Sequence, residues 1–193
     1  MASDETTGTT QTTEAAATAA TAATAATTTR HGAGIDRSEE WAQLRARHLR
    51  AAGERPPSAA RGVHHIALLS SDVERTIGFY QDLLELPLTE VFENRDYQGS
   101  THFFFDIGNG NALAFFDFPG LDLGPYDERL GGLHHLAISV EPERWRHLAA
   151  KLRDAGVPVH EEGGTSLYLQ GPDGERIELI ADPLGEMYGH QVM

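Results

Sequence analysis

The sequence contains no cysteine, which excludes disulfide bonds, thiolate metal sites and cysteine nucleophiles. It also has no apolar run approaching the roughly 18 residues that a membrane-spanning helix needs. Basic residues are scarce, because 15 lysines and arginines stand against 29 acidic residues, for a net charge of −14. Since nucleic acids and anionic membranes attract basic surfaces, neither is an expected partner. Any metal ion must be bound through nitrogen and oxygen.

The N-terminal region has few large side chains. Residues 1–31 are an Ala- and Thr-rich, low-complexity segment, which we expect to be a disordered tail because it offers too little apolar surface to offset its ordering entropy. The segment lacks the basic start and apolar centre of a secretion signal, so a cytoplasmic protein is expected. Residues 32–60 predict a helix with Trp41 on its apolar side, followed by a proline-containing linker.

A seven-residue motif occurs twice in the rest of the chain. It reads Gly-Val-His-His-Ile-Ala-Leu at 62–68 and Gly-Leu-His-His-Leu-Ala-Ile at 132–138. Each copy predicts a strand that is followed by a helix and three further strands. The sequence therefore predicts an α+β domain over 61–183, and the role of the tail at 184–193 is left open. We expect this domain to consist of two paired βαβββ modules (61–119 and 131–183) that form one open, barrel-like cleft for a metal ion.

The second histidine of each motif is a candidate metal ligand. Because alternate residues of a strand face opposite ways, His65 and His135 are expected to point away from the histidines that precede them. Glu178 lies in an otherwise apolar final strand, where a carboxylate is costly unless it is paired or bound to a metal. Two imidazoles and one carboxylate suit non-haem Fe(II), and the same set can hold Mn(II), Zn(II) or Ni(II).

These motifs resemble the vicinal oxygen chelate superfamily, which includes glyoxalase I, fosfomycin resistance proteins, bleomycin-binding proteins, methylmalonyl-CoA epimerase and extradiol dioxygenases. The resemblance covers residues 61–183 and rests on the two His-His strands, on Asp72 with the helix that follows it, and on the segment 168–179. It implies that the metal ligands come from the first and last strand of each module, which again gives His65, His135 and Glu178. The fourth position falls at Ala114 or Phe115, and neither residue can bind a metal.

A three-ligand set disfavours glyoxalase I and the epimerase, and it fits extradiol dioxygenases and fosfomycin-modifying transferases. We therefore expect an Fe(II)-dependent extradiol-type dioxygenase that acts on a small substrate with vicinal oxygens. The strands contain phenylalanines that suit a flat or apolar substrate. The resemblance implies that Tyr168 assists the reaction, and His160 and His102 are candidates for its acid or base.

Three alternatives stay open at this point. The first is a glyoxalase-type lyase or isomerase, and the second is a fosfomycin-type transferase, both using a divalent metal as a Lewis acid. The third is a resistance protein that sequesters a ligand without catalysis, although the intact His-His-Glu set disfavours it. Relatives of this kind are often dimers, so a homodimer is compatible with the resemblance.

Overall fold

The computed structural model describes residues 35–193, so the tail predicted over 1–31 lies outside the described residues. The chain divides into two units, one ending at Arg55 and one spanning 56–193. The first unit contains helix α1 (Ser38–His48) and the short 3-10 helix η1 (Ala52–Glu54). The predicted helix is confirmed, but it ends at His48, and none of its side chains is buried. Trp41, which lies on the apolar side of the predicted helix, is 48% exposed.

The second unit begins with a βαβββ module, module one. Its elements are β1 (His65–Leu69), α2 (Val73–Ile77), η2 (Gly78–Leu83), β2 (Leu88–Glu93), β3 (Thr101–Asp106) and β4 (Ala112–Phe116). The side chain of Asp72 accepts a hydrogen bond from the backbone N–H of Arg75 and so caps the first turn of α2. The helix continues into η2, a π-helix, so the helix predicted over this region is confirmed with a change of geometry in its second half.

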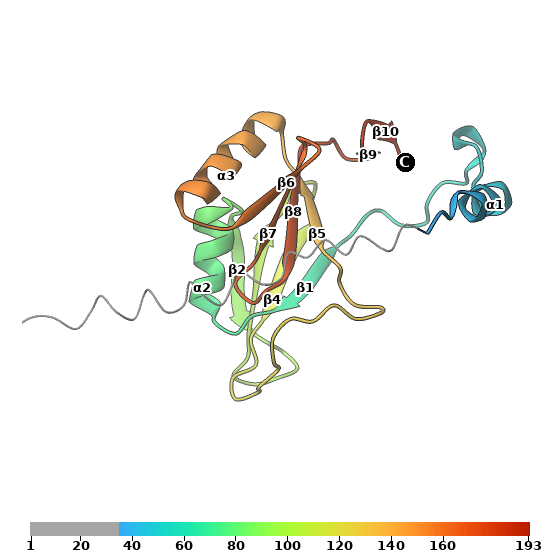
Figure 1. The fold of residues 1–193 in the computed structure, drawn as a ribbon. Coiled ribbons are helices and arrows are strands. Elements are labelled where there is room, and N and C mark those ends of the chain that lie inside the picture. Colours follow the sequence, from blue (N-terminus) through green and yellow to red (C-terminus); the bar gives the residue numbers. More distant parts are fainter. Residues whose placement is uncertain (1–34) are drawn as a thin grey trace, which may run out of the picture. The chain divides into compact units, whose positions relative to one another are not determined.

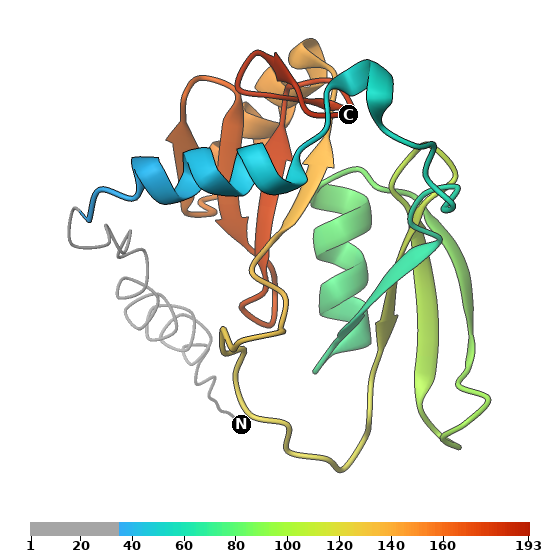
Figure 2. The same ribbon diagram turned by 90° about the vertical axis from the view of Figure 1, so that its right-hand side faces the viewer.

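Module two repeats the same order of elements. It consists of β5 (Leu136–Ser139), α3 (Pro142–Asp154), β6 (Val159–Glu162), β7 (Ser166–Gln170) and β8 (Arg176–Ile180). The two sheets have the equivalent strand orders β1-β4-β3-β2 and β5-β8-β7-β6, and in each the first strand is parallel to the last. Figure 2 shows both sheets, module one in teal to yellow and module two in orange to red. The predicted α+β fold with two repeated modules is confirmed.

One apolar core joins the two modules. Buried residues from both sheets and both helices form a single cluster, whose largest members are Tyr80, Phe103, Phe105 and Phe115 from module one and Trp145, Leu148 and Leu152 from module two. Figure 1 shows α2 and α3 on the same side of the sheets. In β1, Ile66 and Leu68 pack against this core, whereas His65 and Leu69 are exposed. Each sheet therefore has a helix-covered face and an open face.

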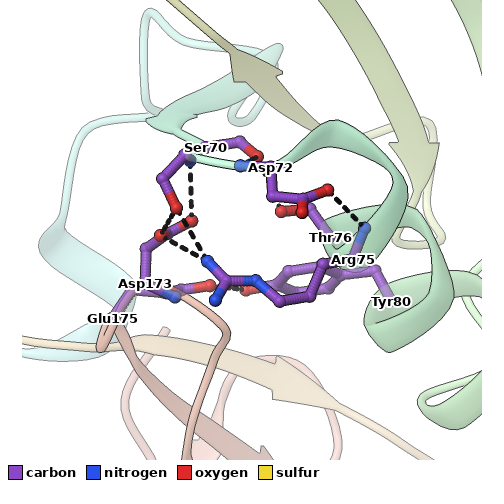
Figure 3. A network of polar contacts seen from close by, with 8 residues as sticks. Ser70, Asp72, Arg75, Thr76, Tyr80, Asp173 and Glu175 are labelled. Carbon is purple, nitrogen blue, oxygen red and sulfur yellow. Dashed lines mark hydrogen bonds and ion pairs between the residues drawn. The ribbon is translucent and has the colours of Figure 1, made fainter. Parts of the chain in front are cut away.

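Polar contacts also connect the modules, as Figure 3 shows. The hydroxyl of Tyr80 on η2 donates a hydrogen bond of 2.6 Å to the buried carboxylate of Glu175 in the β7–β8 turn. Arg75 on α2 forms an ion pair of 2.9 Å with Asp173 of the same turn. These contacts hold the start of β8, and thus Glu178, against module one.

The remaining C-terminal residues form a small hairpin of β9 (Glu186–Met187) and β10 (His190–Gln191). Between residues 35 and 193, no helix combines the length and the apolar character needed to cross a lipid bilayer.

Candidate metal centre

His135 and Glu178 lie next to each other on module two. Glu178 is on β8 and its side chain is 5% exposed, and its Oε2 lies 3.1 Å from Nε2 of His135, which directly precedes β5. Two donors that bind one divalent ion at about 2.1 Å, at right angles, lie about 3 Å apart. Among the ion pairs of residues 35–193, Glu178 has no lysine or arginine partner. A buried carboxylate without a cationic side chain, with an imidazole nitrogen at this spacing, fits a bound divalent metal ion.

Tyr168 completes a row of side chains across the sheet. The strand pairing places His160, Tyr168, Glu178 and Ala137 opposite one another on β6, β7, β8 and β5. The ring centroid of Tyr168 lies 6.1 Å from that of His135. The pKa of Tyr168 is raised to about 12, mainly by burial of its hydroxyl group. The hydrogen bond to Glu178 and the negative charge of Glu178 act in the same direction. The phenol is therefore protonated at neutral pH and can donate a hydrogen bond. His160 is exposed at the end of the row.

The equivalent row in module one has no carboxylate at the metal position. Ala67 pairs with Ala114, just as Ala137 pairs with Glu178, and Phe104 stands where module two has Tyr168. The strand register thus identifies Ala114 as the counterpart of Glu178. Phe115, the other residue that the sequence left open, is fully buried in the core. Module one can therefore contribute His65 but no carboxylate from this row.

His65 lies apart from the other two predicted ligands. It is exposed on the open face of β1, with its ring centroid 6.2 Å from that of Phe104. In the part of the chain that the structure describes, no three histidine, aspartate or glutamate side chains are close enough to hold one metal ion. The structure thus brings together His135, Glu178 and Tyr168, with His160 beside them, and leaves His65 with module one.

His102 belongs to an aromatic surface on the open face of module one. Its ring is stacked on Phe116 at a centroid distance of 3.8 Å and contacts Phe104 at 4.2 Å. Its Nε2 is buried without a hydrogen-bond partner, and burial lowers the pKa of this imidazole. Phe92 and Phe118 extend the surface. Of the five phenylalanines of β3 and β4, three are therefore core residues (Phe103, Phe105 and Phe115), and the half-buried Phe104 and Phe116 belong to this aromatic surface.

The first histidine of each pair does not turn away from the second. Nδ1 of His64 lies 2.9 Å from Nδ1 of His65, and the corresponding distance between His134 and His135 is 2.6 Å. The expectation of opposite faces assumed a regular strand, but β1 begins only at His65 and β5 at Leu136. Side-chain alternation does not apply before the strand has begun, so the two rings of each pair can meet.

A cavity of about 620 Å³ lies near the end of β1. It is bounded by the strand end, the connection between the modules and the β7–β8 turn; its lining includes Leu69, Ser71, Asp117, Phe118, Tyr126 and Glu175. Neither His135 nor Glu178 lines it. The cavity offers room for a small molecule beside the open face of β1.

Comparison with known proteins supports this interpretation of the fold. The model of the Glyoxalase/Bleomycin resistance protein/Dioxygenase superfamily matches residues 62–179. The chain is 26% identical over 136 residues to MhqA of Bacillus subtilis (strain 168), which is named as a ring-cleaving dioxygenase. That match covers 66% of this chain and 42% of MhqA, so the chain spans less than half of the length of this relative.

A second relative is a lactoylglutathione lyase of Haemophilus influenzae, which is 32% identical over 127 residues. This match covers 60% of the chain and 89% of the lyase. Among solved structures, the glyoxylase/bleomycin resistance protein/dioxygenase domain from Frankia sp. EAN1pec has a TM-score of 0.56 at 20% identity, covering 66% of this chain and 96% of that domain. The structural similarity shows the fold.

Proposed function

The chain belongs to the Glyoxalase/Bleomycin resistance protein/Dioxygenase superfamily, and from this premise we propose that it is a metal-dependent, extradiol-type dioxygenase that uses Fe(II). The observation that carries the proposal is the pair formed by His135 and the buried Glu178, whose donor atoms are 3.1 Å apart. A carboxylate and imidazoles that leave coordination positions open suit non-haem Fe(II). When bound, such a metal supplies Lewis acidity and open positions for substrate and dioxygen.

The third ligand in this proposal is His65. His65 and His135 belong to different sheets, and within residues 35–193 no set of three donors is assembled. We place the complete site between two copies of the chain, so that His65 of one protomer approaches His135 and Glu178 of the other. Exposed apolar side chains on module one, including Leu69, Val91 and Phe92, are consistent with a surface that a second copy covers.

The chain's own residues also suggest how a substrate is held. The aromatic surface around Phe104 and Phe116 offers stacking contacts to a planar ring. The Tyr168 hydroxyl, which is protonated at neutral pH, can donate a hydrogen bond to a substrate oxygen. His102, whose Nε2 is unpartnered and whose pKa is lowered by burial, is suited to accept a proton, and His160 is the second candidate.

The central test is oxygen consumption by protein that has been purified anaerobically and loaded with Fe(II). Catechols should be cleaved with the uptake of one O₂ for each ring, and a His135→Ala variant should lose metal and activity together. Turnover with Mn(II) or Ni(II) in the absence of oxygen would instead support a lyase or isomerase, the alternative favoured by the 32% identity to lactoylglutathione lyase. Ligand binding that persists without metal in His135→Ala would indicate a sequestering protein.

Mixing two inactive variants tests whether the site is shared. If His65 comes from the second protomer, a mixture of His65→Ala and Glu178→Gln chains contains heterodimers with one intact site. Random exchange should then restore about a quarter of the wild-type activity. The matched control mixes wild type with a chain that carries both substitutions, which creates no additional intact site. A site assembled within one chain would show no restoration in the first mixture.

A further inference from the structure

The two histidine pairs are built alike, although only one member of each pair is a proposed ligand. The Nδ1 atoms lie 2.6 Å apart in the pair His134–His135 and 2.9 Å apart in the pair His64–His65. Both pairs also meet edge to face, with ring centroids 4.9 and 5.1 Å apart. The same contact at two sites that are 70 residues apart indicates a built arrangement rather than a chance approach of two surface side chains.

The backbone at both sites supports these side-chain positions. The hydroxyl of Tyr126 donates a hydrogen bond of 2.5 Å to the carbonyl oxygen of Leu133 and lies 3.4 Å from that of His134. In module one, the backbone N–H of Ala112 donates to the carbonyl oxygen of His64 at 3.2 Å. Each first histidine is thus anchored through its own backbone before the regular strand begins.

The contact has a consequence for the tautomer of the ligand. Nε2 of His135 faces the carboxylate of Glu178, so this nitrogen must be without a proton when it binds a metal. A neutral imidazole then carries its proton on Nδ1, and that proton points to Nδ1 of His134. Metal-binding histidines generally donate their other ring N–H to an acceptor, which fixes the tautomer and the orientation of the ring.

We propose that His134 and His64 are positioning residues, each accepting the Nδ1 proton of the histidine that follows it and so presenting Nε2 as the metal donor. This assignment rests on the proposed metal site, because it gives His135 and His65 their roles. The usual acceptor in such a contact is a carboxylate or a backbone carbonyl. Here the acceptor is the neighbouring imidazole, and both modules use the same arrangement.

The test compares an acceptor-removing variant with one that keeps an acceptor. His134→Leu removes the ring nitrogen, whereas His134→Asn keeps a side-chain oxygen near the position of Nδ1. His190→Leu, on the exposed strand β10, is the matched control for the loss of an imidazole. Thermal melting of each variant identifies any that fails to fold, and the parallel pair His64→Leu and His64→Asn repeats the comparison in module one.

Two readouts are needed, neither of which is activity. In the protein loaded with diamagnetic Zn(II), ¹⁵N–¹H correlation spectra should show the Nδ1 proton of His135 hydrogen-bonded and slow to exchange with water in the wild type and in His134→Asn. In His134→Leu, this proton should exchange faster. Co(II) affinity should fall by about 10–100-fold in His134→Leu, with a change in the visible Co(II) spectrum, and should recover in His134→Asn.

The outcomes separate this inference from the proposed function. An unchanged exchange rate of the His135 Nδ1 proton and unchanged Co(II) affinity in His134→Leu would overturn the positioning role alone, while loss of Co(II) binding in His135→Ala would still support the site. Metal coordination by both imidazoles of one pair, visible by X-ray absorption, would also overturn the positioning role. If the wild type bound neither Co(II) nor Zn(II), the proposed metal site and the positioning role would fail together.

Discussion

Ala114 and Glu178 occupy equivalent positions in the two sheets, each paired with the alanine that lies two residues after the second histidine of its module. The symmetry of the scaffold is therefore broken where the proposed metal lies. Module two has Tyr168 and Glu178 in its cross-strand row, whereas module one has Phe104 and Ala114. In the proposed function, this difference makes module two the main contributor of metal ligands, whereas module one presents an apolar, aromatic surface.

The first prediction concerns Glu178→Gln. This substitution should weaken the binding of Co(II) or Mn(II) by at least about 10-fold, because it replaces an anionic ligand with a neutral one. The metal-free protein should become more stable by about 1 kcal/mol, because a buried carboxylate without a cationic partner is removed. Calorimetric titration and thermal melting with and without metal measure both effects. Glu162→Gln, an exposed position on the same sheet, is the control.

A metal ligand is distinguished from a structural residue by two effects of opposite sign: its substitution weakens metal binding but stabilises the metal-free protein. A Glu178→Gln variant that is destabilised without metal, and that binds metal as the wild type does, would contradict the proposed role. Equal behaviour of the Glu178→Gln and Glu162→Gln variants would contradict it as well.

The sequence predicted the repeat because the same His-His motif occurs twice, 70 residues apart. It predicted the strands because their apolar residues alternate over short stretches. It also singled out Glu178, since a carboxylate in an apolar strand is conspicuous. The choice between Ala114 and Phe115 needed the strand register, which no local pattern fixes. The contact between His134 and His135 was missed, because its geometry depends on where β5 begins.

The contacts between the modules could not be predicted either. Tyr80 and Glu175 are 95 residues apart in the chain and meet only through the packing of η2 against the β7–β8 turn. Tyr80 has the apolar spacing of an ordinary core residue, and Glu175 has the polar character of an ordinary turn residue. A clue was available only in retrospect, since a tyrosine buried in a core usually needs a partner for its hydroxyl group.

The second prediction concerns that contact. Tyr80→Phe removes the hydroxyl that donates to Oε1 of Glu175 and leaves a buried carboxylate oxygen without this donor. The free energy of unfolding should fall by about 1–3 kcal/mol, with little change in the apolar packing of the ring. Urea denaturation followed by circular dichroism measures the change. Tyr97→Phe, at a position that is 41% exposed, should be nearly neutral, and equal effects of the two substitutions would refute the prediction.

The third prediction is a pH dependence that arises from Glu175. Burial raises the pKa of this carboxyl above its ordinary value of 4.5, although hydrogen bonds from Tyr80 and Asp173 oppose the shift. The folded state therefore holds this proton more tightly than the unfolded state does. The stabilisation that this retained proton provides is fully present below about pH 4.5 and is lost as the pH rises through the raised pKa. Glu175→Gln should therefore remove this part of the decline in the free energy of unfolding.

The measurement is the free energy of unfolding of wild type and Glu175→Gln at intervals between pH 4 and pH 8. Because the substitution also alters hydrogen bonds, the difference in slope is diagnostic and the absolute stability is not. Parallel curves across this interval would show that Glu175 titrates alike in the folded and unfolded states.

The fourth prediction concerns Glu85, which follows η2 with a backbone φ of 60° and forms ion pairs with Arg144, His147 and Lys151 of α3. Hydrogen bonds from Lys151 and His147 lower the pKa of its carboxyl to about 2, from the ordinary value of 4.5. The stabilisation is therefore present above about pH 4.5 and is lost as the pH falls toward 2. The change of stability with pH that Glu85 produces is therefore opposite in direction to the change that Glu175 produces.

Glu85→Gln should reduce the free energy of unfolding at pH 7 by about 1 kcal/mol, a modest value because the cationic partners are partly exposed to solvent. The difference from wild type should shrink between pH 4.5 and pH 2 and in 0.5–1 M salt, on the order of the concentrations that screen surface charges. Chemical denaturation across these conditions tests both dependences, with the exposed Glu74→Gln on α2 as the control. A difference that persists at pH 2 and in high salt would show that Glu85 acts through the packing or backbone conformation of its turn and not through its charge.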